Sequence, residues 1–272
     1  MADIRELCGD LVAEDQVLDA AVDGLAPAAW DIATPAEGWT VRDQISHLAF
    51  FDAAAAVAAS DPARFRADAA EAVKDLPRFI AGPTARGRSM SGAEVLEWWR
   101  AARRTLHETL EGFEPSTRVP WYGSTMSAPS FVTARLMETW AHGQDVFDAL
   151  GARRPATARL RHIAHLGVRA LPNSYRAHRR PVPEDLVRVE LTGPGGEVWT
   201  WGEEGAANVV RGPALDFCLV VTQRRHPDDT RLETAGPVAA EWISIAQAFA
   251  GPPGSGRRPG AGVQVLSPEL ER

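Results

Sequence analysis

The chain has only two cysteines, no surplus of positive charge and no long uninterrupted run of apolar residues. Cys8 and Cys218 are too far apart for a metal-binding or dithiol motif, which favours a reducing, cytoplasmic location. The formal net charge of −7 argues against a nucleic-acid partner, because proteins that bind nucleic acids carry a basic surplus. The longest apolar run, residues 48–59, is interrupted by Asp52 and is shorter than the ~20 residues that cross a membrane.

Several sequence signatures of common enzymes are also missing. The chain contains neither a Gly-x-Ser-x-Gly elbow nor a Cys-x-x-Cys pair, and its GPGGE run falls in a predicted hairpin turn rather than between a strand and a helix. Serine hydrolysis, dithiol redox chemistry and nucleotide hydrolysis therefore lack their usual signals. The acidic N-terminus also differs from a signal peptide, which needs cations and an apolar run. The length of 272 residues fits one large domain or two smaller ones.

Apolar residues at helical spacing predict four long helices in the first half of the chain. Capping-box pairs mark three of their starts, at Asp3 with Glu6, Thr40 with Asp43 and Ser91 with Glu94. The predicted helices cover residues 3–27, 41–60, 92–110 and 130–150. Four amphipathic helices of this length favour an all-α, up-down-up-down four-helix bundle. Between them we expect a short helix after residue 61, a loop at residues 82–89 (GPTARGRS) and a long loop at residues 112–129.

The second half has the pattern of a smaller α+β domain. Alternating residues at 187–192 and 198–201, separated by GPGGE, predict a hairpin, and residues 207–210 predict a third strand. Helices are expected at residues 156–171, 213–223 and 237–250, and a basic linker at residues 172–183. The resulting domain prediction is 1–152 for the helix bundle, 153–185 for a helix and the linker, 186–252 for the α+β domain and 253–272 for a mobile tail.

The fourth predicted helix carries Glu138, His142 and Asp145. Offsets of four and seven residues place all three on one helix face, where Glu138 and His142 can chelate a metal ion. His47, near the start of the second helix, can reach the same point if the two helices pack together. The alternative for Glu138 and His142 is an exposed helical pair. Asp145 is a possible partner that orients an imidazole, a fourth ligand, or a surface carboxylate.

Two runs, WTVRDQISHLAFFD and ARLMETWAHGQDVFDALG, resemble the mycothiol-dependent maleylpyruvate isomerase family of the DinB-like superfamily. The resemblance implies a four-helix bundle that binds a divalent metal, typically zinc, through His47, Glu138 and His142. Residues 185–250 resemble, in general pattern only, the sterol-carrier-like C-terminal domain of many members. Three protein ligands leave a coordination position open, and zinc deprotonates a coordinated thiol. The family therefore implies mycothiol as a cosubstrate.

Two arginine-bearing stretches stand out against the acidic composition. Arginine binds carboxylates through two parallel hydrogen bonds, so Arg224, Arg225 and Arg176 are candidate catalytic residues that hold an acidic substrate. Tyr175 and Arg179, in the same stretch as Arg176, are candidates for binding a polar thiol cosubstrate. The alternative is a solvated linker and a helix C-terminus decorated with cations. The resemblance implies an arginine of the C-terminal half near the metal, without fixing which one.

The sequence therefore predicts a zinc-dependent enzyme, an S-transferase or isomerase, that acts on a small electrophilic and acidic substrate with mycothiol or a similar small thiol. One alternative is a metal-dependent hydrolase that needs no thiol. The other is a non-catalytic protein that binds a metal and a lipid-like ligand. The expected partners are small molecules, with no nucleic acid and no membrane, for a monomer or homodimer.

Overall fold

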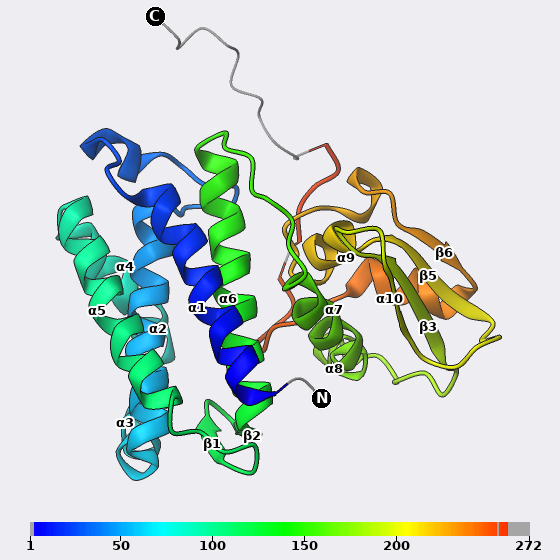
Figure 1. The fold of residues 1–272 in the computed structure, drawn as a ribbon, viewed down its shortest axis with the longest axis horizontal. Coiled ribbons are helices and arrows are strands. Elements are labelled where there is room, and N and C mark those ends of the chain that lie inside the picture. Colours follow the sequence, from blue (N-terminus) through cyan, green and yellow to red (C-terminus); the bar gives the residue numbers. More distant parts are fainter. Residues whose placement is uncertain (1–2, 255, 261–272) are drawn as a thin grey trace, which may run out of the picture. The chain divides into compact units, whose positions relative to one another are not determined.

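The computed structural model describes residues 3–254 and 256–260. The chain divides into two compact units, Met1–Ala152 and Arg153–Arg272, in which helices predominate and two small sheets accompany them (Figure 1). Most of the predicted tail, residues 253–272, lies outside the described residues. None of the helices in the described ranges is long and apolar enough to cross a membrane.

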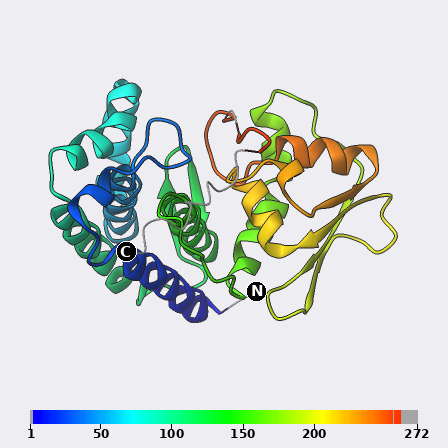
Figure 2. The ribbon, with the colours of Figure 1, turned by 90° about the horizontal axis from the view of Figure 1, so that it is seen from above.

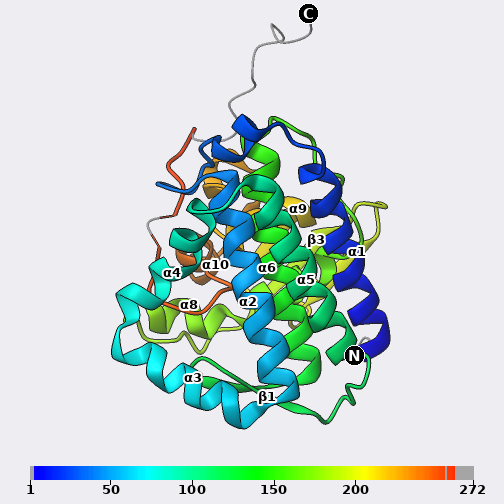
Figure 3. The same cartoon turned by 90° about the vertical axis from the view of Figure 1, so that its left-hand side faces the viewer.

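Four long helices make up most of the first unit, and they run side by side in Figures 1 and 3. They are α1 (Ile4–Val22), α2 (Val41–Ser60), α5 (Gly92–Leu110) and α6 (Ala128–Ala149). Helix α2 packs against both α5 and α6, and α1 packs against α6. Their buried apolar residues form a shared core that includes Leu18, Ile45, Trp99 and Val146. Burial of these faces, rather than helix propensity, accounts for most of the stability of such helices.

Local sequence signals set several of the helix ends. The predicted capping boxes of Thr40 with Asp43 and of Ser91 with Glu94 are both confirmed. At α1 the side chain of Asp3 accepts a hydrogen bond from the Arg5 backbone N–H, at 3.2 Å, and among the described residues no contact from Glu6 completes the predicted capping box. The helix ends at Val22, short of the predicted end, and a 3-10 turn at Pro27–Asp31 follows it.

The predicted loop at residues 82–89 is wrong. The structure has two helices here, α3 (Pro62–Lys74) and α4 (Leu76–Arg88), although α4 contains Gly82, Pro83 and Gly87. Packing overrides the low helix propensity of these residues, because α4 lies directly against α2. At Gly87 the approach is so close that an added Cβ would lie 1.8 Å from Ser46 Oγ.

The predicted loop at residues 112–129 is also wrong in part, so the first unit is not purely helical. It contains an antiparallel hairpin of β1 (Arg118–Trp121) and β2 (Ser124–Ser127), turned at Gly123 with φ of 78°. Strands of four residues are too short to show a clear alternation in the sequence, which explains the miss.

The second unit contains a four-stranded sheet, in the order β4-β3-β5-β6. Its strands are β3 (Val187–Thr192), β4 (Val198–Trp201), β5 (Asn208–Pro213) and β6 (Glu233–Ala235). The predicted hairpin is confirmed, since β3 and β4 pair antiparallel over the predicted ranges. Strand β5 pairs parallel to β3, and β6, which the sequence analysis missed, pairs antiparallel to β5.

Four helices accompany this sheet, and Figure 2 shows strands and helices from above. They are α7 (Leu160–Arg169), α8 (Leu171–Ala177), α9 (Ala214–Val221) and α10 (Pro237–Ile245), with a 3-10 turn at Pro227–Asp229. Helices α7, α9 and α10 contact the strands. The prediction of a linker at residues 172–183 is wrong over its first half, because Pro172 lies in the first turn of α8, where proline is tolerated.

Candidate metal centre

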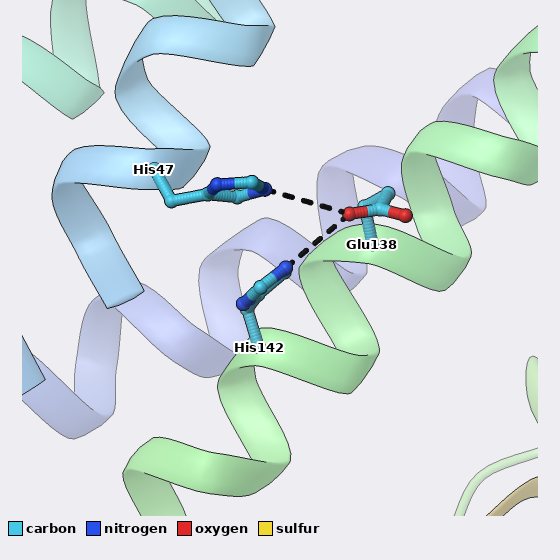
Figure 4. A group of neighbouring side chains, drawn as sticks. All are labelled: His47, Glu138 and His142. Atoms are coloured by element: carbon cyan, nitrogen blue, oxygen red, sulfur yellow. Dashed lines mark ion pairs between the residues drawn. The ribbon is translucent and has the colours of Figure 1, made fainter. Parts of the chain in front are cut away.

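Three side chains with metal-ligating atoms converge between α2 and α6. His47 lies in the second turn of α2, and Glu138 and His142 lie one turn apart on α6. The three residues each offer one ligand atom, and these atoms all lie within 4.8 Å of one another. Figure 4 shows both imidazole rings directed at the carboxylate. The structure thus brings together three residues that the sequence analysis singled out from two different helices.

The two imidazoles meet the same carboxylate oxygen. Nε2 of His142 lies 3.3 Å from Oε2 of Glu138, and Nε2 of His47 lies 3.7 Å from it. The ring centroids of the two histidines are 4.3 Å apart. The side chains of His47, Glu138 and His142 are 21%, 25% and 13% exposed, so solvent-borne molecules can reach the cluster.

The electrostatics of the cluster favour an ionised carboxylate. Burial raises the pKa of Glu138, but hydrogen bonding to His142 and His47, together with the charges of His142 and Arg135, outweighs burial. The result is a pKa well below the ordinary value for a glutamate. Glu138 is therefore a negatively charged ligand atom next to two nitrogen ligands.

Gln44, one turn before His47 on α2, orients the ring of His142. Its Oε1 lies 2.6 Å from Nδ1 of His142, and its Nε2 donates to Thr34 Oγ1 at 3.0 Å. An amide oxygen only accepts, so Nδ1 of His142 carries a proton. Nε2, the other ring nitrogen, faces Glu138 and is the atom through which His142 can bind a cation once it gives up the proton that it shares with the carboxylate.

Asp145 lies behind this contact. It is only 1% exposed, so the possibility of a surface carboxylate is excluded. Its Oδ2 lies 3.5 Å from Nε2 of Gln44, which connects it to His142 through the Gln44 amide. It is not part of the three-residue group whose ligand atoms converge.

Aromatic rings surround the two histidines. Trp39 stacks on His142 with centroids 5.9 Å apart and is tilted against His47 at 5.4 Å. Phe51, one turn after His47, lies 4.5 Å from its ring. These rings restrict the imidazoles and shield one side of the cluster from water, which strengthens electrostatic interactions within it.

A second polar cluster occupies the same two helices. Asp52 Oδ1 accepts from Arg135 Nη2 at 2.8 Å, and Asp52 Oδ2 accepts from Trp99 Nε1 at 3.0 Å. Both charged side chains are almost fully buried, at 3% and 4% exposure. Sequence analysis missed Gln44, Asp52 and Arg135. Their positions at helical spacing from His47 and Glu138 are the only signal that could have found them.

The remaining predicted site residues all lie in the second unit. Arg176 and Arg179 are exposed, at and just after the end of α8. Tyr175 is buried in the core, with its hydroxyl 3.2 Å from Glu241 Oε2, and burial raises its pKa to about 12. Arg224 and Arg225 are half-buried after α9, where each donates to a nearby backbone carbonyl.

Comparison with solved structures shows a similar fold. The crystal structure of mycothiol-dependent maleylpyruvate isomerase matches with a TM-score of 0.58, covering 86% of this chain and 93% of that chain. A histidine-to-alanine mutant of the same enzyme matches with a TM-score of 0.59 and the same coverage. The sequence identity of 14% means that this likeness concerns the fold alone.

Sequence comparison is more specific. Two uncharacterized proteins, from the CDC 1551 / Oshkosh and H37Rv strains of Mycobacterium tuberculosis, are 46% identical over 257 residues, which is 94% of this chain and 100% of each relative. A family model described as wyosine base formation matches residues 183–233. The model of the mycothiol maleylpyruvate isomerase N-terminal domain matches residues 11–147, which include every residue of the metal-ligating cluster. The chain therefore belongs to the mycothiol maleylpyruvate isomerase N-terminal domain family.

Proposed function

We propose that this protein is a divalent-metal enzyme, with zinc as the metal, that uses mycothiol or a similar small thiol. The reaction is an S-transfer or isomerisation of a small electrophilic, acidic substrate. The observation that carries the proposal is the convergence of His47, Glu138 and His142 on one point between α2 and α6. Family membership supports the thiol, because the family is described by mycothiol and by an isomerase.

The donor set fits a zinc ion. Two imidazole nitrogens and one carboxylate oxygen, with a position left open, are typical of catalytic zinc sites. Tetrahedral coordination with bonds of about 2.0–2.1 Å places neighbouring ligand atoms roughly 3.3 Å apart. The two histidine nitrogens lie 3.3 Å and 3.7 Å from the Glu138 oxygen, close to that separation. A bound divalent cation supplies Lewis-acid activation and lowers the pKa of a coordinated thiol or water.

The residues around the cluster have distinct tasks in this proposal. Gln44 holds His142 in the tautomer that presents Nε2 to the cation, and Asp145 holds Gln44 in turn. Trp39 and Phe51 limit the access of water on their side of the imidazoles.

We also propose roles for polar residues of the second unit: Arg224, Arg225 and Arg176 bind a substrate carboxylate, and Arg179 contacts a thiol cosubstrate. Tyr175 is 1% exposed with its hydroxyl 3.2 Å from Glu241, so it supports its own stretch from the core rather than contacting the thiol as the sequence predicted. Guanidinium groups suit the first task because they form two parallel hydrogen bonds with a carboxylate.

The proposal also covers the fold type of the two units, the cellular location and the oligomeric state. We propose that α1, α2, α5 and α6 form a DinB-like, up-down-up-down four-helix bundle and that the second unit is a sterol-carrier-like domain. The protein then acts in the cytoplasm as a monomer or homodimer.

Metal analysis joined to a thiol-dependent turnover assay tests the proposal. We expect about one divalent metal per chain after purification without chelators, and isomerisation or consumption of maleylpyruvate or a related acid only when mycothiol is added. His47→Ala and Glu138→Gln should lose both metal and turnover. His162→Ala, a histidine variant in the second unit, serves as the matched control and should keep both.

Three outcomes would contradict the proposal or change it. Unchanged metal content in His47→Ala would show that the ion binds elsewhere. Turnover without thiol would identify a metal-dependent hydrolase. A bound lipid, with no reaction of any tested acid and thiol, would instead favour a ligand-binding protein.

A further inference from the structure

The first unit contains a cavity of about 470 Å³ beside the metal-ligating cluster. It lies between α2, α3, α4, α5 and the β1–β2 hairpin, whose arrangement Figure 3 shows. This volume is within the ~300–1,000 Å³ of typical small-molecule sites. Its lining side chains are mostly apolar, and they include Phe50, Ala54, Val57, Phe65, Phe79 and Tyr122.

Small residues keep the cavity open. Ala53 and Ala54 on α2 and Ala72 on α3 line walls where larger side chains would fill the space. The C-terminal end of α4 lies close against α2 at Gly87, so the helix is fixed there without closing the cavity. The cavity therefore results from small side chains at these positions within an otherwise closely packed unit.

The interior of the cavity is an apolar environment. Burial, together with the negative charge of Asp68, raises the pKa of Tyr122 to about 12. The ring of Tyr122 makes aromatic contacts with Phe65 at 5.1 Å and with Phe79 at 5.3 Å. Such walls favour a hydrocarbon or aromatic body over a polar one.

One positive charge at the cavity is available to a ligand. The guanidinium carbon of Arg86 lies 4.0 Å above the ring centroid of Trp98, and both residues line the cavity. Within the described ranges Arg86 makes no ion pair. Asp68, the acidic residue of the lining, faces Arg64 at 3.7 Å in a highly exposed pair. Beside Trp98 the charge at the cavity is that of Arg86, which suits a carboxylate.

Phe51 separates the cavity from the metal-ligating cluster. Its ring lies 4.5 Å from that of His47 on one side. On the other side it contacts three cavity walls, Phe50 at 5.1 Å, Phe79 at 6.1 Å and Tyr122 at 6.0 Å. The ring of Phe51 thus lies between a molecule in the cavity and the histidines, and that molecule contacts none of the metal-ligating residues.

We propose that this cavity is a binding site for a monocarboxylic acid with an apolar acyl or aryl body, whose carboxylate is held by Arg86. The apolar body packs between the phenylalanines, Tyr122 and the alanines of α2. The guanidinium, already stacked on Trp98, keeps its hydrogen-bond donors free for the carboxylate. This inference goes beyond the thiol chemistry proposed above and does not depend on a bound metal.

Calorimetric titration of the full-length protein tests the site. Octanoate and 4-phenylbutyrate are the acid probes, and octan-1-ol and octylamine are neutral and cationic probes of matched body. We expect saturable binding of one acid per chain, unaffected by chelation of metal. Arg86→Gln should weaken acid binding about tenfold, because a charge-assisted contact is lost, and leave the alcohol unchanged. Arg78→Gln, at an exposed arginine of the same helix outside the lining, is the matched control and should bind normally.

A second variant examines the cavity itself. Ala54→Leu fills the space and should weaken the acid and the alcohol alike. The proposal is overturned by the absence of acid binding at millimolar concentration, by equal binding of acid to Arg86→Gln, or by preference for the amine. Acid binding that disappears on chelation or in His142→Ala, but survives in Arg86→Gln, would place the acid at the metal instead. That result would overturn the cavity site while leaving the proposed enzyme function intact.

Discussion

Helices α2 and α6 carry two polar clusters that differ in whether their charges are paired within the protein. Asp52 and Arg135 form a buried pair at 2.8 Å, and Trp99 donates to the second carboxylate oxygen, so this cluster is complete within the protein. Glu138 faces two imidazoles at 3.3 Å and 3.7 Å in a partly exposed position. The first cluster has both charges and all its nearby oxygens engaged. In the second, the carboxylate oxygen and the two imidazole nitrogens converge within 4.8 Å of one another.

The Asp52–Arg135 cluster therefore serves stability, and the His47–Glu138–His142 cluster is available for chemistry. A buried ion pair that is closed on itself holds two helices in register and offers nothing to a ligand. A partly exposed set of ligand atoms has room for a cation and a further molecule. We call the Asp52–Arg135 pair the closed cluster and the His47, Glu138 and His142 group the open cluster. The charge of Arg135 also lowers the pKa of Glu138, so the closed cluster helps to keep the carboxylate of the open cluster ionised.

Removing one charge of the closed cluster should lower the free energy of unfolding more than any other change considered. Asp52→Ala leaves the guanidinium of Arg135 buried without its carboxylate, and we expect the free energy of unfolding to fall by about 3–5 kcal/mol. Urea denaturation measures this. The double variant Asp52→Ala with Arg135→Met should recover part of the loss, because the unpaired charge is removed as well. A loss below about 1 kcal/mol in the single variant would mean that the two clusters do not differ as described.

The second largest change in stability is expected from a packing change where α4 meets α2. A Cβ at Gly87 would lie 1.8 Å from Ser46 Oγ and 2.7 Å from Ser46 Cβ, so Gly87→Ala must push α4 away from α2. We expect a loss of about 1–3 kcal/mol in thermal or urea unfolding, typical of overpacking. Gly82→Ala, in the same helix with nothing within 4 Å of an added Cβ, is the control and should be neutral or stabilising. Equal stability of the two variants would contradict the close approach.

A third prediction concerns the metal affinity of the open cluster alone. Gln44→Met removes the acceptor of His142 Nδ1 while keeping the size of the side chain. We expect metal affinity to fall about 10–100-fold, as for other residues that orient metal ligands. Competition with a chromophoric chelator measures the affinity. Gln44→Glu keeps an acceptor and should retain more of it. An unchanged affinity in Gln44→Met would show that Gln44 does not position the imidazole.

The smallest change in stability is expected at the ion pair of Asp19, which is less buried than the pair of Asp52 with Arg135. Asp19 is 17% exposed and pairs with Arg100 at 2.7 Å and with Arg103, and hydrogen bonding to Arg100 holds its pKa below the ordinary value. A lowered folded-state pKa adds stability above the unfolded pKa of about 3.9, and this stability is lost as the pH falls through the folded-state value. Asp19→Asn should cost at most about 1 kcal/mol at pH 7.

The pH profile is the measurement for Asp19. The stability difference between the wild type and Asp19→Asn should be full at neutral pH and vanish in strong acid. A difference that is constant across this range would assign the effect to packing rather than to charge.

Local signals in the sequence were sufficient for several elements of the fold. The capping boxes at Thr40 and Ser91 depend on residues three positions apart, and the β3–β4 hairpin depends on alternation around a short turn. Elements whose local propensity is poor were missed. Helix α4 contains two glycines and, besides Pro77 in its first turn, the interior Pro83, and it forms because it packs against α2, which no local pattern reveals.

The candidate site shows the same division. Glu138 and His142 could be paired from the sequence because an offset of four residues fixes their common helix face. His47 could be added because it lies near the start of a second helix that can pack against the first, and the family resemblance implies the same residue. Gln44 orients His142 from 98 residues away. Its helical spacing from His47 was its one signal in the sequence, and that spacing does not show a contact that depends on how two helices approach each other.

Helix faces, caps, the hairpin and the residue types that can bind a metal could be read from local sequence, since each depends on neighbours within a turn or two. The burial of Asp145 behind Gln44, the pairing of Asp52 with Arg135 and the place of Arg86 at a cavity follow from packing between helices. Those outcomes depend on the distance and rotation between helices. Packing of the whole core sets both, because no single helix buries its own apolar face.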